Sequence, residues 1–200
     1  SGKYFRTFFF NDKAYRQVAE RLIDLGANLN LAQTISSRRS ILDFYMDEYI
    51  KGERGFQENG IKVLKWLAQH GADVNGYMPR MGRSIFQAML SKKDFQTNRQ
   101  ITEIFLKNGL DINHSYAENG DKTSIMEIGS VGDASEDKHY LTKMTNFLLR
   151  KGANPNMQSE NGRTALHWAI RWSNLPVAKV LIPQTNQSLT DDQGRTSLEY

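Results

Sequence analysis

The chain has 200 residues, 39% of them hydrophobic, and a formal net charge of +4 with acidic residues interleaved among the basic ones. Because a nucleic-acid binder normally concentrates positive charge on one face, this pattern favours a solvated surface and no nucleic-acid partner, with attraction to an acidic protein partner as the second interpretation. The chain has no cysteine and no run of about 18 or more apolar residues, so we expect no disulfide framework, no thiolate metal site and no transmembrane segment.

The first predicted helix runs from Ala14 to Leu25, with apolar side chains roughly on one face and charged side chains on the other. Upstream, the phenylalanines between residues 5 and 10 follow no turn motif, so we expect an atypical first helix whose aromatic residues cap the end of a stack. The predicted helix ends in the sequence Gly-Ala-Asn-Leu-Asn, starting at Gly26. Similar endings recur at Gly71, Gly109 and Gly152. Four copies of one helix end indicate small stacked units rather than one ordinary core.

The second and third predicted units each have a short first helix, a polar segment and a second helix. In the second unit, the polar segment 51–60 is too long for a tight connection and precedes a helix at residues 61–70. In the third unit, we interpret residues 91–98 as another insertion, followed by a helix at 101–107. Both units are therefore expected to be lengthened between their two helices.

The fourth unit has a predicted insertion at 130–137 and a second helix from Tyr140 to Lys151. The fifth has helices within residues 161–170 and 174–182, and residues 191–200 form a sixth turn with the start of a helix. The glycines that end the second helices follow one another at 45, 38 and 43 residues, whereas the fifth unit repeats after 33. Only the fifth unit is therefore of regular length.

The clearest motif lies in the fifth unit. It is Asn-Gly-Arg-Thr-Ala-Leu-His, starting at Asn161, and it follows Leu-Leu-Arg-Lys-Gly-Ala-Asn-Pro-Asn, starting at Leu148. These segments resemble the ankyrin repeat, in which a Gly-x-Thr-Pro-Leu-His turn and helix precede a helix ending Leu-Leu-x-x-Gly-Ala-Asp-Val-Asn. The resemblance covers nearly the whole chain. It implies an all-α ankyrin-repeat solenoid of about five helix-turn-helix units with lengthened inter-helix connections, monomeric on its own.

The resemblance also implies the boundaries inside a single domain of residues 1–200. They are an N-terminal half-repeat at 1–30, repeats at 31–75, 76–113, 114–156 and 157–190, and a truncated C-terminal cap at 191–200. A hydroxyl side chain stands where each first helix begins and is expected to cap it. These residues are Ser40, Ser84, Thr123, Thr164 and Thr196.

Motifs for chemistry are missing from the sequence. It contains no Gly-x-Ser-x-Gly elbow, no phosphate-binding Gly-x-x-x-x-Gly-Lys-Ser/Thr loop and no His-Glu-x-x-His. His167 stands at the histidine position of the ankyrin motif, where the resemblance implies a hydrogen bond to a neighbouring turn rather than catalysis. We therefore expect no enzyme activity, no metal site and no cofactor.

Partner contacts in ankyrin proteins usually come from the turn tips and the exposed positions of the first helices, which line the concave side. Transferred by position, the resemblance implies a set of partner-binding residues spread over all repeats. They are Arg39, Asp47, Glu48, Tyr77, Arg80, Arg83, Lys92, Tyr116, Asp121, Arg163, Arg171 and Trp172. Trp172 beside Arg171 is the most informative pair, because Trp and Arg are enriched in binding hot spots. The alternative is that Trp172 covers the truncated sixth unit.

The predicted insertions offer a second possible contact surface. Per-repeat insertions often gather on one face used for binding, and Phe56, Phe95 and Tyr140 are the aromatic residues expected to anchor it. The alternative is that these segments are tolerated surface loops without a partner.

We predict a non-catalytic protein–protein interaction module. A resemblance to small bacterial ankyrin proteins favours an immunity protein that binds and occludes a secreted toxin or effector enzyme, in the periplasm rather than the cytoplasm and lipid-anchored if a leader has been removed. The alternatives are a bacterial effector that binds a host protein, the substrate-docking region of a larger enzyme, and a module that binds nucleic acid or a membrane surface through its basic charge.

Overall fold

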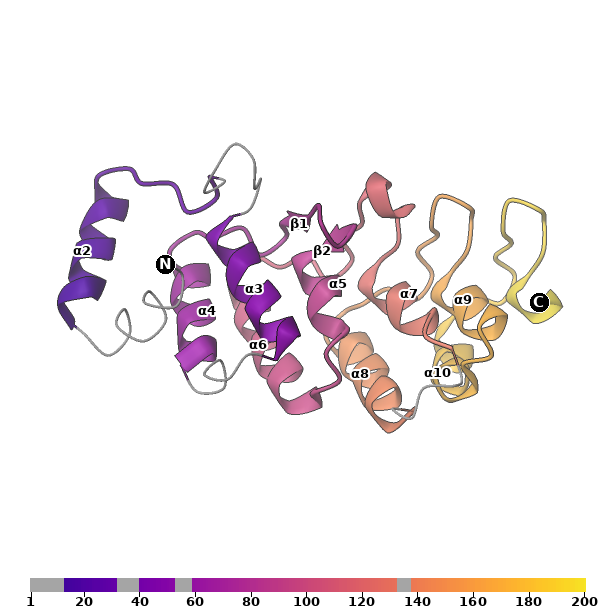
Figure 1. Ribbon diagram of the computed structural model, residues 1–200. Helices are drawn as coiled ribbons and strands as arrows, with labels where there is room; N and C mark the ends of the chain where they lie inside the picture. Colours follow the sequence, from indigo (N-terminus) through magenta and orange to yellow (C-terminus); the bar gives the residue numbers. More distant parts are fainter. Residues whose placement is uncertain (1–12, 32–39, 53–58, 133–137) are drawn as a thin grey trace.

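The computed structural model describes residues 13–31, 40–52, 59–132 and 138–200, which are mostly helical and lie in an elongated row (Figure 1). The helix α2 lies at one end of the row and the C-terminus at the other (Figure 1). The helices are α2 (Lys13–Asp24), α3 (Ile41–Lys51), α4 (Asn59–Gln69), α5 (Ile85–Leu90), α6 (Phe95–Lys107), α7 (Ser124–Gly129), α8 (Lys138–Arg150), α9 (Ala165–Arg171) and α10 (Leu175–Leu181). The described residues also include three short 3-10 helices: η1 (Ala117–Asn119), η2 (Ile182–Gln184), which continues directly from α10, and η3 (Ser197–Glu199).

The helices from α3 to α10 form two parallel layers. The first helices α3, α5, α7 and α9 pack on one another in that order, and the second helices α4, α6, α8 and α10 form the other layer. The described strands are the two-residue β1 (Tyr77–Met78) and β2 (Arg83–Ser84), which pair antiparallel as a small hairpin in one turn. The all-α class fits this architecture, while the number of five complete units remains a prediction, because α2 is a single helix in the described part of the chain.

The apolar core lies between the two layers and extends from α3 to α10. It is continuous from Leu42 and Met46 in α3 to Leu181 in α10. Each pair of helices therefore buries its apolar faces against its neighbours, as expected for a stack in which no unit has a core of its own. Within the first-helix layer, α7 and α9 approach closely at Gly129, where an added Cβ would lie 2.8 Å from the backbone oxygen of Ala165.

An asparagine ladder ties each helix end to the next. Asn75 Nδ2 donates to the carbonyl oxygen of Gly109 at 2.9 Å, and its Oδ1 accepts from the backbone N–H of Asp111 at 2.8 Å. Asn30 and Asn113 make the same two bonds to the following helix end. This geometry explains why the ending Gly-x-x-x-Asn recurs in the sequence. The preceding glycines have φ near +90°, the left-handed region that favours glycine.

The predicted hydroxyl caps are confirmed at four of the five first-helix starts. Ser84 and Gln87, and likewise Thr164 and His167, form reciprocal capping boxes, in which each side chain accepts from the other residue's backbone N–H. Ser40 and Thr196 are engaged in the same way, each with an acidic residue three positions later. The prediction is wrong at Thr123, whose buried hydroxyl oxygen has no hydrogen-bond partner.

The predicted insertion at 91–98 is wrong in its extent. The connection between α5 and α6 is only residues 91–94, and the extra length of the third unit lengthens α6 at its N-terminus. Asp94 caps this longer helix by accepting from the backbone N–H of Thr97 at 3.1 Å, and the ring of Phe95 meets Phe147 edge-on. Residues 95–98 are therefore the first turn of α6, and the connection is limited to the four residues before it. The connection between α3 and α4 and that between α7 and α8 lie largely outside the described residues.

Candidate functional site

Of the three contact residues predicted in the second unit, the structure describes the side chain of Asp47. Arg39 lies outside the described residues, and the side chain of Glu48 is not described. Asp47 is buried and accepts a hydrogen bond from Lys51 Nζ at 2.7 Å, one turn further along α3. The structure therefore contradicts the exposed position that we expected for Asp47.

The two tyrosines expected at the turn tips pack on each other. The rings of Tyr77 and Tyr116 have centroids 5.0 Å apart, and the Tyr116 hydroxyl donates to the carbonyl oxygen of Asn75. Burial, with the negative charge of Asp73 second, raises the pKa of Tyr116 to about 12. Both tyrosines are half-buried, so they stabilise neighbouring turns and leave only part of their rings exposed.

Arg80 and Asp121 lie at the same turn tips. Arg80 is exposed, whereas Asp121 is half-buried and has a φ of 55° in the turn before α7. Neither side chain has an ion pair or hydrogen bond among the described residues. These two positions remain accessible contact candidates.

Arg83 and Lys92 make contacts within the chain. Arg83 lies 3.9 Å from a Glu127 carboxylate oxygen and donates through Nε to the carbonyl oxygen of Met81. Lys92 donates to the carbonyl oxygen of Tyr49 at 2.8 Å and stands over the ring of that tyrosine. Lys92 therefore joins two units on the connection side of the stack rather than facing a partner on the first-helix side.

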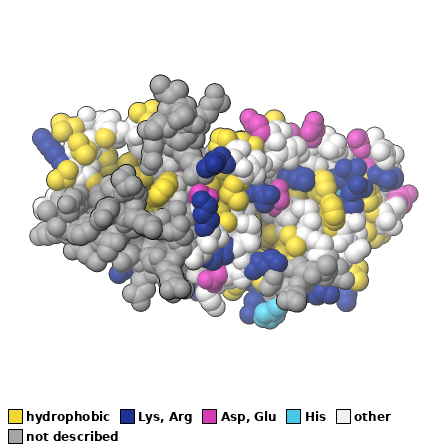
Figure 2. All heavy atoms as spheres, viewed as in Figure 1, with side chains coloured by type: hydrophobic (Ala, Val, Ile, Leu, Met, Phe, Trp, Pro, Cys, Tyr) yellow, Lys and Arg dark blue, Asp and Glu magenta, His cyan; other side chains and the backbone are white. Residues whose placement is uncertain are grey.

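The C-terminal end of the stack brings three arginines around one aromatic ring. The guanidinium carbons of Arg163, Arg171 and Arg195 lie 5.9, 6.0 and 4.4 Å from the ring centroid of Tyr200. Figure 2 shows dark blue side chains gathered over the end of the molecule where α9 and the C-terminus lie. We call Arg163, Arg171, Arg195 and Tyr200 the arginine cluster.

A buried carboxylate organises the inner part of the cluster. The side chain of Asp191 is 0% exposed, and its Oδ2 accepts from Arg195 at 2.8 Å and from the Tyr200 hydroxyl at 2.5 Å. Arg163 donates to the Tyr200 hydroxyl at 2.7 Å and lies 4.0 Å from the same Oδ2. The hydrogen bonds from Arg195, above all, hold the pKa of Asp191 far below its ordinary value. The carboxylate is therefore ionised at neutral pH and fixes Arg163 and Arg195.

A polar cleft of about 400 Å³ opens beside the cluster. It is lined by Arg171, Trp172, Arg195, Glu199 and Tyr200. The Trp172 side chain is 49% exposed, and Arg171 has neither an ion pair nor a hydrogen bond among the described residues. The structure therefore brings together the two residues that the sequence marked as most informative and leaves both accessible.

The connection that carries Trp172 is short and firmly held. Asn174 is buried, accepts from the backbone N–H of Val177 and donates to the carbonyl oxygen of Ile128 in α7 at 3.2 Å. Ser173 turns the chain with a φ of 55°. Because both flanks of the connection are fixed, Trp172 is presented from a rigid turn. In contrast, Trp168 is buried between the cations of Lys122 and Arg163, with its ring centroid 4.0 Å from Lys122 Nζ.

Arg195 and Tyr200 were missed by the sequence prediction. A signal for Arg195 was present, since a basic residue precedes the N-cap of successive first helices. These residues are Arg83, Lys122, Arg163 and Arg195. The signal for Tyr200 was weaker, because only the folded chain brings its ring against Arg163, which lies 37 residues earlier.

His167 has a structural environment. Its Nδ1 accepts from the backbone N–H of Thr164, so Nε2 carries the proton and faces the carbonyl oxygen of Arg195 at 3.1 Å. Burial is the largest cause that lowers the pKa of His167 from its ordinary value of 6.5.

In the described residues, no group of three or more His, Asp or Glu side chains is placed to hold a metal ion. None of the helices there is both long and apolar enough to cross a bilayer.

Two of the three aromatic anchors expected for the second surface can be placed, and both pack against other side chains of the chain. Tyr140 is buried, and its hydroxyl accepts from Asn98 Nδ2 at 2.7 Å, while Phe95 packs partly buried against Phe147. Phe56 lies outside the described residues. The anchors at Phe95 and Tyr140 are therefore wrong as exposed contacts, because both side chains hold α6 and α8 together.

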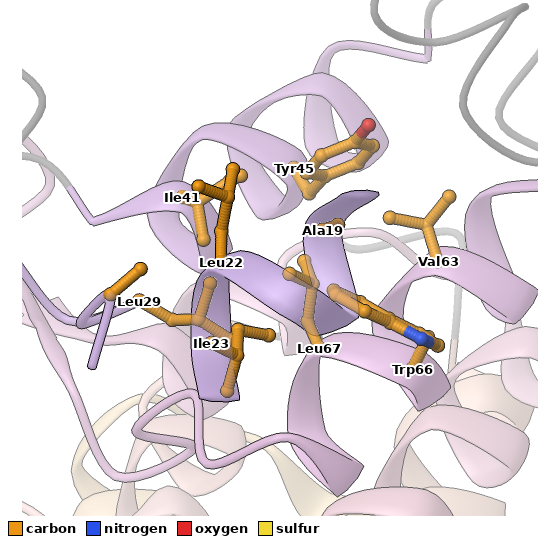
Figure 3. Close-up of a pocket in the computed structure, with 10 residues that line it drawn as sticks. Ala19, Leu22, Ile23, Leu29, Ile41, Tyr45, Val63, Trp66 and Leu67 are labelled. Atoms are coloured by element: carbon orange, nitrogen blue, oxygen red, sulfur yellow. The ribbon is translucent and has the colours of Figure 1, made fainter. Parts of the chain in front are cut away.

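An apolar cavity of about 160 Å³ lies where α2 meets α3 and α4 (Figure 3). Leu22 and Ile23 of α2 face Tyr45, Trp66 and other apolar side chains across it (Figure 3). The predicted apolar face of α2 is therefore only partly used, because Val18 within the helix and Leu25 directly after it are exposed.

Comparisons with known proteins agree with the repeat pattern. Residues 133–200 match the family model described as ankyrin repeats (3 copies). A putative ankyrin repeat protein of Acanthamoeba polyphaga mimivirus is 40% identical over 43 residues, which are 22% of this chain and 10% of that protein. Rabankyrin-5 of Mus musculus and of Homo sapiens is 28% identical over 141 residues, 68% of this chain and 12% of each relative. The chain thus spans about a tenth of the length of these relatives.

Proposed function

We propose, from the ankyrin repeats that residues 133–200 carry, that this chain is a non-catalytic module that binds a partner protein through its first-helix side, mainly at its C-terminal end. Ankyrin repeats generally serve protein–protein interaction. The observation that carries the proposal is the exposed pair Arg171 and Trp172 beside a cleft at the end of α9. Trp and Arg are the residue types most enriched among interface hot spots.

The scaffold around this pair supports a binding role because it is already ordered. The asparagine ladder joins successive helix ends, and Asp191 fixes Arg163 and Arg195 before any partner arrives. A preorganised site loses little conformational entropy on binding, so more of the contact energy appears as affinity. The exposed turn tip at Arg80 could extend the contact along the same side.

The finer hypotheses share this contact mechanism. An immunity protein would occlude a toxin or effector enzyme, an effector would bind a host protein, and a docking region would hold a substrate for an enzyme. The relatives reported above come from a virus and two mammals, so they give the bacterial alternatives no support. We therefore base the proposal on the interaction module alone.

The test is affinity purification with the whole chain as bait in extracts of the cells that contain it. Arg171→Ala and Trp172→Ala are compared with Arg150→Ala, an exposed arginine at the end of α8 in the other layer. We expect a protein that binds the wild type and Arg150→Ala directly, and whose retention falls in the other two variants. Equal retention by all four proteins would contradict the proposed site.

A further inference from the structure

The three arginines around the cleft differ in how many hydrogen bonds and ion pairs they already make within the chain. Arg163 and Arg195 are bound to Tyr200, and both lie next to the Asp191 carboxylate. Arg171 faces the Tyr200 ring and has no hydrogen bond or ion pair among the described residues. A guanidinium carries five donors in a fixed fork, so Arg171 has its whole hydrogen-bonding capacity available for a ligand.

The charged side chains that line the cleft are two arginines, Arg171 and Arg195, and one carboxylate, Glu199. The Asp191 side chain is 0% exposed and used by Arg195, while Glu199 accepts from the backbone N–H and hydroxyl of Thr196 at 2.6 and 2.7 Å. His167, packed behind Tyr200, has its pKa lowered by burial and is neutral at neutral pH. Together with Arg163 and Asp191 behind the lining, three arginines stand against two carboxylates, so the net charge of these side chains is positive and favours an anion.

The remaining wall of the cleft is aromatic. Trp172 is 49% exposed and lines the cleft next to Arg171, and Tyr200, whose ring lies near Arg171 and Arg195, lines it as well. A volume of about 400 Å³ admits one side chain with its neighbouring backbone. Nucleic-acid recognition would call for a basic stripe along the face, whereas acidic side chains are interleaved with basic ones here.

We propose that this cleft binds an acidic segment of the partner protein, with an Asp or Glu carboxylate on the fork of Arg171 and an adjacent apolar side chain on the Trp172 ring. Arg195 also lines the cleft and adds positive charge there, held in place by Asp191. Bidentate contact between guanidinium and carboxylate gives both strength and orientation. The inference rests on the proposed function and names the chemistry of the partner at that site.

The test uses a displayed library of short random peptides, selected on the whole chain. We expect the selected peptides to be enriched in Asp and Glu next to an apolar residue. Arg171→Gln should weaken the binding of a selected peptide about tenfold or more, since a hydrogen-bonded charge is lost. Replacing the acidic residues of that peptide by Asn and Gln should weaken its binding to the wild-type chain by a similar factor. Arg150→Gln, the matched control on α8, should bind like the wild type.

Each other outcome has a definite meaning. Selection of no peptide, selection without acidic enrichment, or equal binding by wild type and Arg171→Gln would overturn the inference. Neutral peptides whose binding is lost in Trp172→Ala would leave the proposed interaction site standing. If duplex DNA bound more tightly than any selected peptide and depended on Arg171, the cleft would belong to a nucleic-acid surface, and the inference would be wrong.

Discussion

Two sets of polar and aromatic side chains at opposite places in the stack differ in their surroundings. On the connection side, the Tyr49 hydroxyl donates to Asn98 at 2.7 Å, and Asn98 donates to Tyr140, all three being buried. At the C-terminal end, Arg171 and Trp172 are exposed, and Arg171 has no ion pair among the described residues. The first set joins α3, α6 and α8 through buried hydrogen bonds, and the second set is accessible to a partner. What separates the scaffold from the proposed contact surface is therefore whether the hydrogen-bond donors are already used within the chain, and not the type of residue.

Asn98→Ala should have the largest effect on stability. Asn98 joins Tyr49, Tyr140 and the Lys92 carbonyl oxygen through three hydrogen bonds in a fully buried position. Losing a buried network of this kind should lower the free energy of unfolding by about 3 kcal/mol. Urea unfolding followed by circular dichroism measures it, with exposed Gln100→Ala on the same helix as the control. Equal stability of the two variants would mean that the network does not support the stack.

Gly129→Ala should come second. An added Cβ would lie 2.8 Å from the Ala165 carbonyl oxygen and 3.4 Å from the backbone nitrogen of Ala169, so α7 and α9 would have to separate. We expect a loss of about 2 kcal/mol in the same unfolding experiment. Gly132→Ala, where the nearest atom would be 3.7 Å away, provides the comparison and should be nearly neutral. A stable Gly129→Ala protein would show that the first helices pack less tightly than described.

His167→Gln should change the pH dependence of stability more than the stability itself. Gln87 forms the same capping box in α5 and donates to the Lys122 carbonyl oxygen, as His167 Nε2 does to that of Arg195. The folded pKa of His167 is lowered, so its contribution is complete above 6.5 and is lost as the pH falls below that value. The variant should lose less stability than the wild type between pH 7 and more acidic buffers. Parallel pH profiles for the two proteins would contradict a buried neutral His167.

Arg171→Ala and Trp172→Ala should have the smallest effect on stability. Both side chains are exposed, and among the described residues Arg171 makes no hydrogen bond or ion pair and lies 6.0 Å from the Tyr200 ring, so we expect changes within about 0.5 kcal/mol. Thermal unfolding of the same preparations used for binding measures this. If Trp172→Ala destabilised the chain as much as Gly129→Ala, Trp172 would be covering the end of the stack, as the alternative interpretation holds.

Much of the repeat architecture could be predicted because its signals are local. The ending Gly-x-x-x-Asn encodes a left-handed glycine and one rung of the ladder, and the residues at 164 and 167 encode a capping box. The sequence did not predict the structure correctly where the burial of a side chain depends on the neighbouring unit of the stack. Residues 91–98 are as polar as a loop, yet the cap at Asp94 begins a helix there, and Tyr140 is hidden by α6.

Of the candidate site, only the exposed residues Arg171 and Trp172 could be predicted from the sequence. Trp172 and Arg171 are neighbours in the sequence, and their exposure follows from their place at the end of α9. The buried part of the site depends on Asp191, Arg195 and Tyr200, which reach Arg163 only when the last turn folds back on α9. Hydrogen bonds between distant positions leave no periodic trace in a single sequence.

Hydrogen–deuterium exchange of the chain with and without a captured partner tests the central claim most directly. We expect slower exchange on binding in residues 163–175 and 191–200, and no change in residues 91–98, which lie on the connection side. Protection confined to residues 91–98 and the N-terminus of α8, with none around Trp172, would contradict an interaction site at the C-terminal end of the stack.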